Sequence, residues 1–386
     1  MAEKIKILFI VTDFYQAGTE RFTYELDKAI DKSRFEIHIL SLLPLNHSKQ
    51  WKDYYYEKHK ALGTPIHFLD EVKFTPKAQI TDRIKFRILK TPLTDEKAQV
   101  EKFLQQFQAI SFLGEYAYPS FAKYLNENNE QKSIIHIMNS IHQKRDLYAA
   151  YKKEKAYNFC SGFDDARIQE ELSAFSNYRH TYLPLSINLK EDKNPWLSRS
   201  DASGKIGIFT RLSVHKPLDP FLYAFQLLLD RIPNLELHIF GSGNPEKEGM
   251  MRYVRQLGLT ESVFFRGHQE DILETAQAEN LDLVWFHGYY GEPGGFAGFD
   301  ITSIGIPQIF WDFSNSAFSK EQTIYPMYNH LIQFVDKSYA VLTDISEAKS
   351  LSELQYEDLY AKRDIRKNVR IIENLWIQTA SITHAR

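Results

Sequence analysis

The sequence predicts an α/β protein in which two doubly wound parallel sheets form two separate domains. Short apolar runs alternate with stretches of helical length in both halves of the chain. Such alternation favours parallel strands that are joined by crossover helices. A polar stretch, residues 189–204, interrupts the pattern, and 386 residues are more than one ordinary domain needs. We therefore expect two Rossmann-like domains that face a cleft.

Composition and charge narrow the functional classes. Hydrophobic residues make up 43% and charged residues 25% of the chain, which excludes a disordered protein. The net charge of −3 gives no reason to expect nucleic acid as a partner. The single cysteine, Cys160, excludes an internal disulfide framework and fits a reducing compartment. Because no apolar run approaches the ~20 residues that span a bilayer, we expect a cytoplasmic protein.

The first half of the sequence, residues 1–188, is expected to form the first Rossmann-like domain. Its first apolar run is rich in β-branched and aromatic residues, as in a strand buried on both faces. After a turn that contains Gly18, Phe22 and Leu26 follow at the spacing of one helix face, and residues 95–107 also have helical length. The runs expected to be strands are 5–12, 35–42, 65–69, 109–114, 133–138 and 156–161.

The second domain is expected over residues 205–364. Residues 189–204, which contain proline, glycine and several serines, are the predicted linker before it. The helical pattern of 219–232 predicts a helix with Asp219 as its N-cap and Pro220 in its first turn. The runs expected to be strands are 205–210, 235–243, 263–267, 281–286 and 306–311.

The C-terminus has helical periodicity with few breaking residues, from about residue 359 to 381. We expect its final helix, about 365–386, to pack back onto the first domain. In open α/β sheets, ligands bind beyond the carboxyl ends of the strands, and clefts between domains are favoured sites. Loops that follow strands are therefore the places to look for function.

Two loops that follow strands carry candidate phosphate ligands. Arg211 and Lys216 stand five residues apart after the first strand of the second domain. Together they could neutralise a diphosphate, although a solvated surface pair is the alternative. Gly18 precedes the first helix of the first domain, where a phosphate could bind to the helix N-terminus. A purely conformational role of this glycine is the alternative.

A glycine-rich loop in the second domain lies between two acidic residues. Glu292 and Asp300 stand eight positions apart, and the backbone N–H groups of Gly294, Gly295 and Phe296 could face an anion or a hydroxyl at the start of a helix. The carboxylates could bind sugar hydroxyls, or they could be the acid and base of a hydrolase. A surface turn with two solvated acids is the third possibility.

The order and spacing of these motifs resemble the GT-B glycosyltransferases, specifically the large retaining group numbered GT4. The resemblance covers essentially the whole chain and is strongest over residues 205–309. Its pieces are a cation pair after a strand, a Gly-x-Gly turn, an acidic pair eight residues apart and a Gly-x-Pro turn. They correspond here to Arg211 and Lys216, Gly241 and Gly243, Glu292 and Asp300, and Gly305 and Pro307.

The resemblance implies a role for each residue. Arg211 and Lys216 would hold the donor diphosphate, Glu292 would bind hydroxyls of the transferred sugar, and Asp300 would bind the ribose. Gly18 would let its loop close over the phosphate or the acceptor. The further donor-binding residues would be Gly241, Gly243, Gly294, Gly295 and Phe296.

The implied reaction is transfer of a hexose-type sugar from a nucleoside diphosphate sugar, with UDP favoured, to a glycan, lipid-linked or protein acceptor. The anomeric configuration would be retained. No cofactor or metal is expected, because side chains supply the positive charge and the sequence contains neither an Asp-x-Asp motif nor a His/Cys cluster.

The sequence departs from the family pattern at two places. Asp300 replaces the usual glutamate and is one methylene shorter. Where the family often has a histidine, this chain has Met138 or Asn139, with His136 and His142 as neighbours. Either histidine could be catalytic, and a structural role is the alternative for both. These departures leave open a degenerate protein that supports a partner glycosyltransferase; a sugar-nucleotide epimerase is a further alternative.

One basic segment has no place in the donor site. Residues 73–90 carry six basic residues and one acid, with isoleucines at helical spacing. The segment could contact anionic lipid at the inner face of a membrane or a lipid-linked acceptor. A solvated helix with its isoleucines in the core is the alternative.

Overall fold

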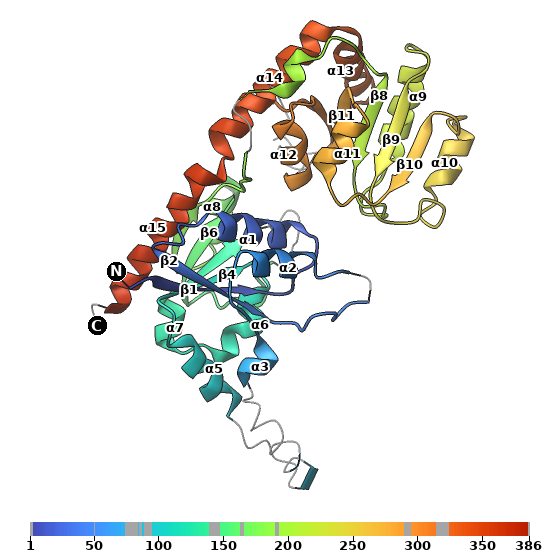
Figure 1. Ribbon diagram of the computed structural model, residues 1–386. Coiled ribbons are helices and arrows are strands. Elements are labelled where there is room, and N and C mark those ends of the chain that lie inside the picture. Colours follow the sequence, from blue (N-terminus) through green and yellow to red (C-terminus); the bar gives the residue numbers. More distant parts are fainter. Residues whose placement is uncertain are drawn as a thin grey trace. The chain divides into compact units, whose positions relative to one another are not determined.

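The chain forms two compact units, which are described separately below (Figure 1). The first contains Met1–Asn188 together with Asp364–Arg386, and the second contains Leu189–Arg363. The computed structural model describes residues 3–49, 51–73, 84, 87–88, 95–138, 147–162, 166–189, 193–288, 295–313 and 324–384.

The first unit is built on a seven-stranded sheet of order β3-β2-β1-β4-β5-β6-β7. All of its strand pairs are parallel. The carboxyl ends of its strands therefore meet at one edge of the sheet. The strands are β1 (Ile5–Val11), β2 (Phe35–Ser41), β3 (Ile66–Phe68), β4 (Ala109–Leu113), β5 (Ser133–Ile137), β6 (Ala156–Ser161) and β7 (Asn177–Tyr182).

Helices cover both faces of this sheet, with α1 and α2 on one side and α5, α6 and α7 on the other (Figure 1). Phe22 and Leu26 of α1 are buried, which confirms the predicted helix face. The helices are α1 (Gly18–Ala29), α2 (Tyr54–Ala61), α3 (Leu69–Lys73), α5 (Glu96–Leu104), α6 (Ala117–Phe121), α7 (Glu127–Gln131), α8 (Ala166–Leu172) and α15 (Ile365–His384).

Helix α15 packs onto the first unit, as the sequence predicts. Trp376 is fully buried, and its indole Nε1 donates a hydrogen bond of 2.9 Å to Ser111 Oγ. Its ring lies 5.7 Å from that of Phe9 and 5.6 Å from that of Phe35. The predicted periodic segment, about residues 359–381, is not one helix. Helix α14 (Ile345–Lys362) ends within it, and the chain then passes from the second unit to the first before α15 begins.

The second unit contains a six-stranded parallel sheet of order β10-β9-β8-β11-β12-β13. Its strands are β8 (Lys205–Phe209), β9 (Glu236–Phe240), β10 (Val263–Gly267), β11 (Leu283–Gly288), β12 (Gln308–Asp312) and β13 (Met327–Tyr328). Its helices are α9 (Asp219–Leu229), α10 (Met250–Gln256), α11 (Ile272–Ala278), α12 (Gly295–Ser303), α13 (Leu331–Thr343) and α14 (Ile345–Lys362).

The expected capping role of Asp219 is wrong. Leu218 is the N-cap residue of α9, and Asp219 and Pro220 are the first two helical residues. Leu218 is 1% exposed and belongs to the core of the second unit. Asp219 therefore lies in the first turn of the helix and does not cap it.

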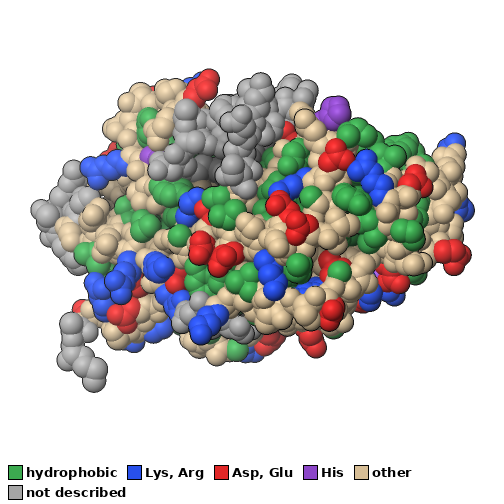
Figure 2. All heavy atoms as spheres, turned by 90° about the horizontal axis from the view of Figure 1, so that it is seen from above, with side chains coloured by type: hydrophobic (Ala, Val, Ile, Leu, Met, Phe, Trp, Pro, Cys, Tyr) green, Lys and Arg blue, Asp and Glu red, His purple; other side chains and the backbone are tan. Residues whose placement is uncertain are grey.

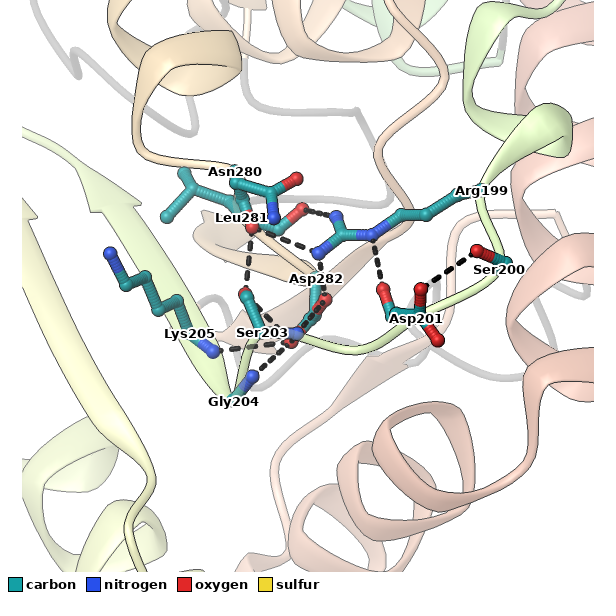
Figure 3. Close-up of polar contacts among 9 residues, drawn as sticks. All are labelled: Arg199, Ser200, Asp201, Ser203, Gly204, Lys205, Asn280, Leu281 and Asp282. Carbon is teal, nitrogen blue, oxygen red and sulfur yellow. Dashed lines mark hydrogen bonds and ion pairs between the residues drawn. The ribbon is translucent and has the colours of Figure 1, made fainter.

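Hydrogen bonds fasten the end of the predicted linker to the second unit (Figure 3). The carboxylate of Asp282 accepts bonds from the backbone N–H groups of Ser203, Gly204 and Lys205, at 2.6–3.2 Å. Arg199 pairs with the same carboxylate at 2.5 Å. The polar composition of this segment therefore serves defined contacts, which hold the entry to β8.

The strands predicted from the sequence are present, but two others were not predicted. One is β7, whose polar sequence NYRHTY occupies the edge of the sheet, where its residues stay partly exposed. The other is the two-residue strand β13. The predicted class, two Rossmann-like α/β domains with a C-terminal helix that returns to the first, is confirmed.

The surface and the helix lengths add two observations. On the face that Figure 2 shows, basic and acidic side chains are intermixed among the described residues, without a surface of a single sign. None of the helices that the structure describes is long and apolar enough to cross a membrane.

Candidate functional site

A cation-bearing loop, residues 210–218, follows the carboxyl end of β8 and leads into α9. The neighbouring Gly-x-Gly turn after β9 holds it. The backbone N–H of Thr210 donates to Phe240 O at 2.9 Å, and that of Leu212 donates to Ser242 O at 2.8 Å. Arg211 lies between these two anchor points, so its position is set by the turn.

The two glycines of this turn are required by close packing. Gly241 and Gly243 have φ values of +154° and +129°. A Cβ at Gly241 would lie 1.6 Å from the carbonyl oxygen of Thr210, and one at Gly243 would lie 2.5 Å from that of Leu212. Only glycine allows this approach. The structure therefore connects both glycines to the position of the cation-bearing loop.

The structure brings Arg211 and Lys216 close enough to interact. Burial lowers the pKa of Lys216 below its usual value, and the positive charge of Arg211 adds to the shift. Arg211 is exposed, whereas Lys216 is half-buried. Two neighbouring positive charges above the end of a strand favour a dianionic ligand such as a diphosphate.

A residue that the sequence did not single out, His287, lies beneath this loop at the end of β11. It is 6% exposed, and its Nε2 lies 2.9 Å from the carbonyl oxygen of Pro217. Burial lowers the pKa of His287 to about 4, and the positive charge of Lys216 contributes to the shift. A histidine near the end of a central strand is the available sequence signal, but nothing in the sequence pairs it with residue 217.

The second loop leads into α12, which begins at Gly295 with φ +67°. Asp300 lies in this helix and is 7% exposed. The helix is tied to β12, because the side-chain amide of Gln308 donates to Gly298 O at 2.8 Å and to Thr302 Oγ1 at 2.6 Å. Asp300 therefore stands on a helix that two hydrogen bonds join to β12.

Some predicted site residues have no described position. Glu292, Gly294 and His142 lie outside the residues that the structure describes. Phe296 is described and is half-buried in the first turn of α12, with its ring 5.8 Å from that of Phe299. The predicted roles of these residues remain predictions.

In the first unit, His136 lies inside the sheet. It is 2% exposed, and its Nε2 has no hydrogen-bond partner in the part of the chain that the structure describes. Burial lowers its pKa to about 3. Its ring lies 6.0 Å from that of Phe22 in α1. These features are those of a packed side chain, and its catalytic role remains a prediction.

Two carboxylates that the sequence did not single out, Asp13 and Glu20, lie at the same edge of the first unit as Gly18. Asp13 follows β1 and accepts a hydrogen bond of 3.0 Å from the backbone N–H of Tyr15, and Glu20 lies in the first turn of α1. Burial, and then the charge of Asp13, raises the pKa of Glu20 to about 7. Glu20 can therefore exchange a proton near neutral pH.

No group of three or more His, Cys, Asp or Glu side chains that could hold a metal ion occurs among the described residues. The cationic character of the candidate site comes from Arg211 and Lys216.

Comparisons with known proteins find one family model and several solved structures that are similar to this chain. The family model described as glycosyl transferases group 1 matches residues 191–317, which include the cation-bearing loop, the Gly-x-Gly turn and α12. A search by sequence among curated proteins finds no match.

Solved structures match the chain over nearly its full length. HepE of Anabaena in complex with UDP has a TM-score of 0.70 at 12% identity, covering 97% of this chain and 100% of its own. TarM of S. aureus, solved as a variant with fondaparinux, α-GlcNAc-glycerol and UDP, has a TM-score of 0.68 at 11% identity, covering 96% and 99%. The pneumococcal O-GlcNAc transferase GtfA with UDP and GlcNAc has a TM-score of 0.64 at 9% identity, covering 100% of both chains.

These structural similarities show the GT-B fold, and the family model matches residues that lie within the second unit. Together they support a glycosyltransferase of the GT-B fold, and residues 191–317 are similar to the glycosyl transferases group 1 family.

Proposed function

We propose that the protein is a retaining glycosyltransferase of the GT4 type that transfers a hexose from a UDP-sugar to a glycan, lipid-linked or protein acceptor. The observation that carries the proposal is that Arg211 and Lys216 interact electrostatically in a loop held by the Gly-x-Gly turn. Such a pair can bind a diphosphate and stabilise the charge that develops as it leaves.

The donor would bind along the carboxyl edge of the second sheet. In this proposal Arg211 and Lys216 hold the diphosphate, Asp300 binds the ribose, and Glu292 binds the transferred sugar. The preference for UDP is supported by the complexes of HepE, TarM and GtfA, each of which contains UDP. No metal is required, because the two side chains supply the positive charge.

The chemical step would be a front-side attack of an acceptor hydroxyl on the anomeric carbon. The bond between this carbon and the diphosphate oxygen breaks as the bond to the acceptor oxygen forms. The departing phosphate oxygen takes the acceptor proton. Arg211 and Lys216 stabilise this oxygen most strongly when its charge is largest, which lowers the barrier.

The acceptor would bind to the first unit. Asp13 and Glu20 at its carboxyl edge could contact acceptor hydroxyls, and Gly18 would allow the intervening loop to approach the ligand. A catalytic role of His136 or His142, and contact of residues 73–90 with a membrane, are further parts of the proposal. His142 and most of residues 73–90 lie outside the residues that the structure describes.

The test is calorimetric titration of UDP, GDP and ADP without metal, on wild type and on Arg211→Ala. Binding of one nucleotide that is lost in the variant supports the donor assignment. If none of the three binds, the chain is better explained as a degenerate partner of another glycosyltransferase. Conversion of the donor sugar without any acceptor would instead indicate an epimerase.

A further inference from the structure

The side chain of His287, a residue of β11, is buried beneath the cation-bearing loop. Its ring stacks on Phe313, with centroids 5.0 Å apart and an interplanar angle of 22°. The ring of Phe221, in α9, approaches it edge-on at 5.0 Å and 73°. The two aromatic neighbours leave the imidazole little freedom to rotate, so its nitrogen atoms have defined directions.

The hydrogen bond of His287 shows which of its ring nitrogens carries a proton. A carbonyl oxygen can only accept, so the Nε2 that lies 2.9 Å from Pro217 O carries a proton. With its pKa lowered to about 4, mainly by burial, the imidazole is otherwise unprotonated at neutral pH. His287 is thus a neutral donor and adds no third positive charge beside the two cations.

The accepting carbonyl belongs to the residue that directly follows Lys216. Pro217 has no backbone N–H of its own and lies before Leu218, the N-cap of α9. The first intrahelical bond runs from Leu222 N to Leu218 O, so the carbonyl of Pro217 lies outside the helical ladder. The carbonyl of Pro217 can therefore accept a hydrogen bond from another element, and the donor is His287 in the sheet.

We propose that His287 is a positioning residue that holds the Lys216–Pro217 segment against the sheet and so places the Lys216 ammonium group for a diphosphate ligand. This inference rests on the proposed function, in which Lys216 binds the donor. The glycine turn anchors the loop at Thr210 and Leu212, and His287 anchors it at the other end.

The test compares two amide substitutions of different reach. The amide nitrogen of glutamine can take the place of imidazole Nε2, whereas that of asparagine is one bond too short. Both variants lose the aromatic ring, so they share the packing loss. His238→Gln is the control, because His238 is also a fully buried, ring-packed histidine in the second unit but lies in β9.

The affinity for UDP is measured calorimetrically without metal, together with the Tm of each variant. We expect His287→Asn to weaken UDP binding about tenfold, the effect of one lost hydrogen bond at a partly buried acceptor. His287→Gln should stay within about threefold of wild type. His238→Gln should lower the Tm and leave the affinity unchanged. Equal affinities of the Gln and Asn variants would overturn the inference.

A second readout separates this inference from the proposed function. The pH dependence of Lys216 labelling by an amine reagent reports its pKa, which should rise toward the ordinary value in His287→Asn and stay low in His287→Gln. If wild type binds no nucleotide, the proposed donor site fails, but this titration still tests the anchor. If Lys216 titrates alike in both variants, His287 does not position it.

Discussion

Two buried histidines, one in each unit, occupy comparable places near the carboxyl end of a central strand but differ in what they contact. His136 in β5 is 2% exposed and His287 in β11 is 6% exposed, and burial lowers the pKa of both. His287 donates to the backbone beside Lys216, whereas His136 has no partner for its buried Nε2 among the described residues. The partner of the imidazole, and not its place in the fold, distinguishes a candidate positioning residue from a packed one.

The carboxyl edges of the two sheets also differ, in the charge of the side chains that lie there. In the second unit the cation-bearing loop carries Arg211 and Lys216, and this loop is held by a glycine turn and by His287. In the first unit the ionisable groups beside Gly18 are the carboxylates Asp13 and Glu20. A cationic loop suits a diphosphate, and an acidic edge suits a hydroxyl-rich ligand. The predictions below test this comparison, beginning with the largest expected effect.

The glycine turn should be the least tolerant part of the cation-bearing loop. Gly241→Ala should lower the free energy of unfolding by at least about 3 kcal/mol, because the new Cβ would overlap the Thr210 carbonyl. Gly258→Ala is the matched control, since Gly258 has φ +69° but no atom within 4 Å of the added Cβ. It should lose only about 1 kcal/mol. Urea denaturation measures both, and equal losses would contradict the packing argument.

Removal of one cation should affect ligand affinity and not stability. Arg211→Ala should weaken UDP binding about 100-fold, or roughly 2.7 kcal/mol, because a charge-assisted contact is lost. Arg231→Ala should leave the affinity unchanged, since Arg231 pairs with Asp336 on the exposed surface. Calorimetry in low and high salt checks both. An unchanged affinity in Arg211→Ala would remove the diphosphate assignment.

The acidic edge should make stability depend on pH. The pKa of Glu20 is raised from 4.5 to about 7, so the folded state binds the proton more tightly than the unfolded state. Stability is therefore highest below pH 4.5 with respect to this group, and it falls as the pH rises through about 7.

Glu20→Gln removes this pH dependence. At pH 8 the variant should be more stable than wild type by about 2 kcal/mol, and at pH 4 the difference should vanish. Unfolding curves at the two pH values measure the change. Parallel curves for wild type and variant would show that Glu20 ionises normally.

The smallest effect is expected at His136. His136→Leu replaces the buried imidazole by an apolar side chain of similar size, so UDP affinity and transfer activity should stay within about twofold of wild type and the stability should change by less than about 1 kcal/mol. Loss of activity with normal nucleotide binding would instead assign His136 a catalytic role. With this result, His136 could no longer be described as a packed histidine in contrast to His287.

Much of the fold could be predicted from the sequence because local patterns carry it. The continuous apolar run of β1 and the runs of β8 and β11 reflect strands covered on both faces by helices. Polar β7 escaped prediction because an edge strand need not be apolar. The break between α14 and α15 was also not predicted, because the chain passes from one unit to the other there without a proline or glycine.

For the candidate site, the sequence by itself determined which segments carry the cations and the acids, because these segments follow predicted strands. Only the tertiary structure decided that Gly241 and Gly243 pack against the loop of Arg211, that His287 lies beneath residue 217, and that Asp13 shifts the pKa of Glu20. Close approach and burial arise between segments that are distant in sequence. No local pattern encodes them, since they depend on how the strands are ordered in each sheet.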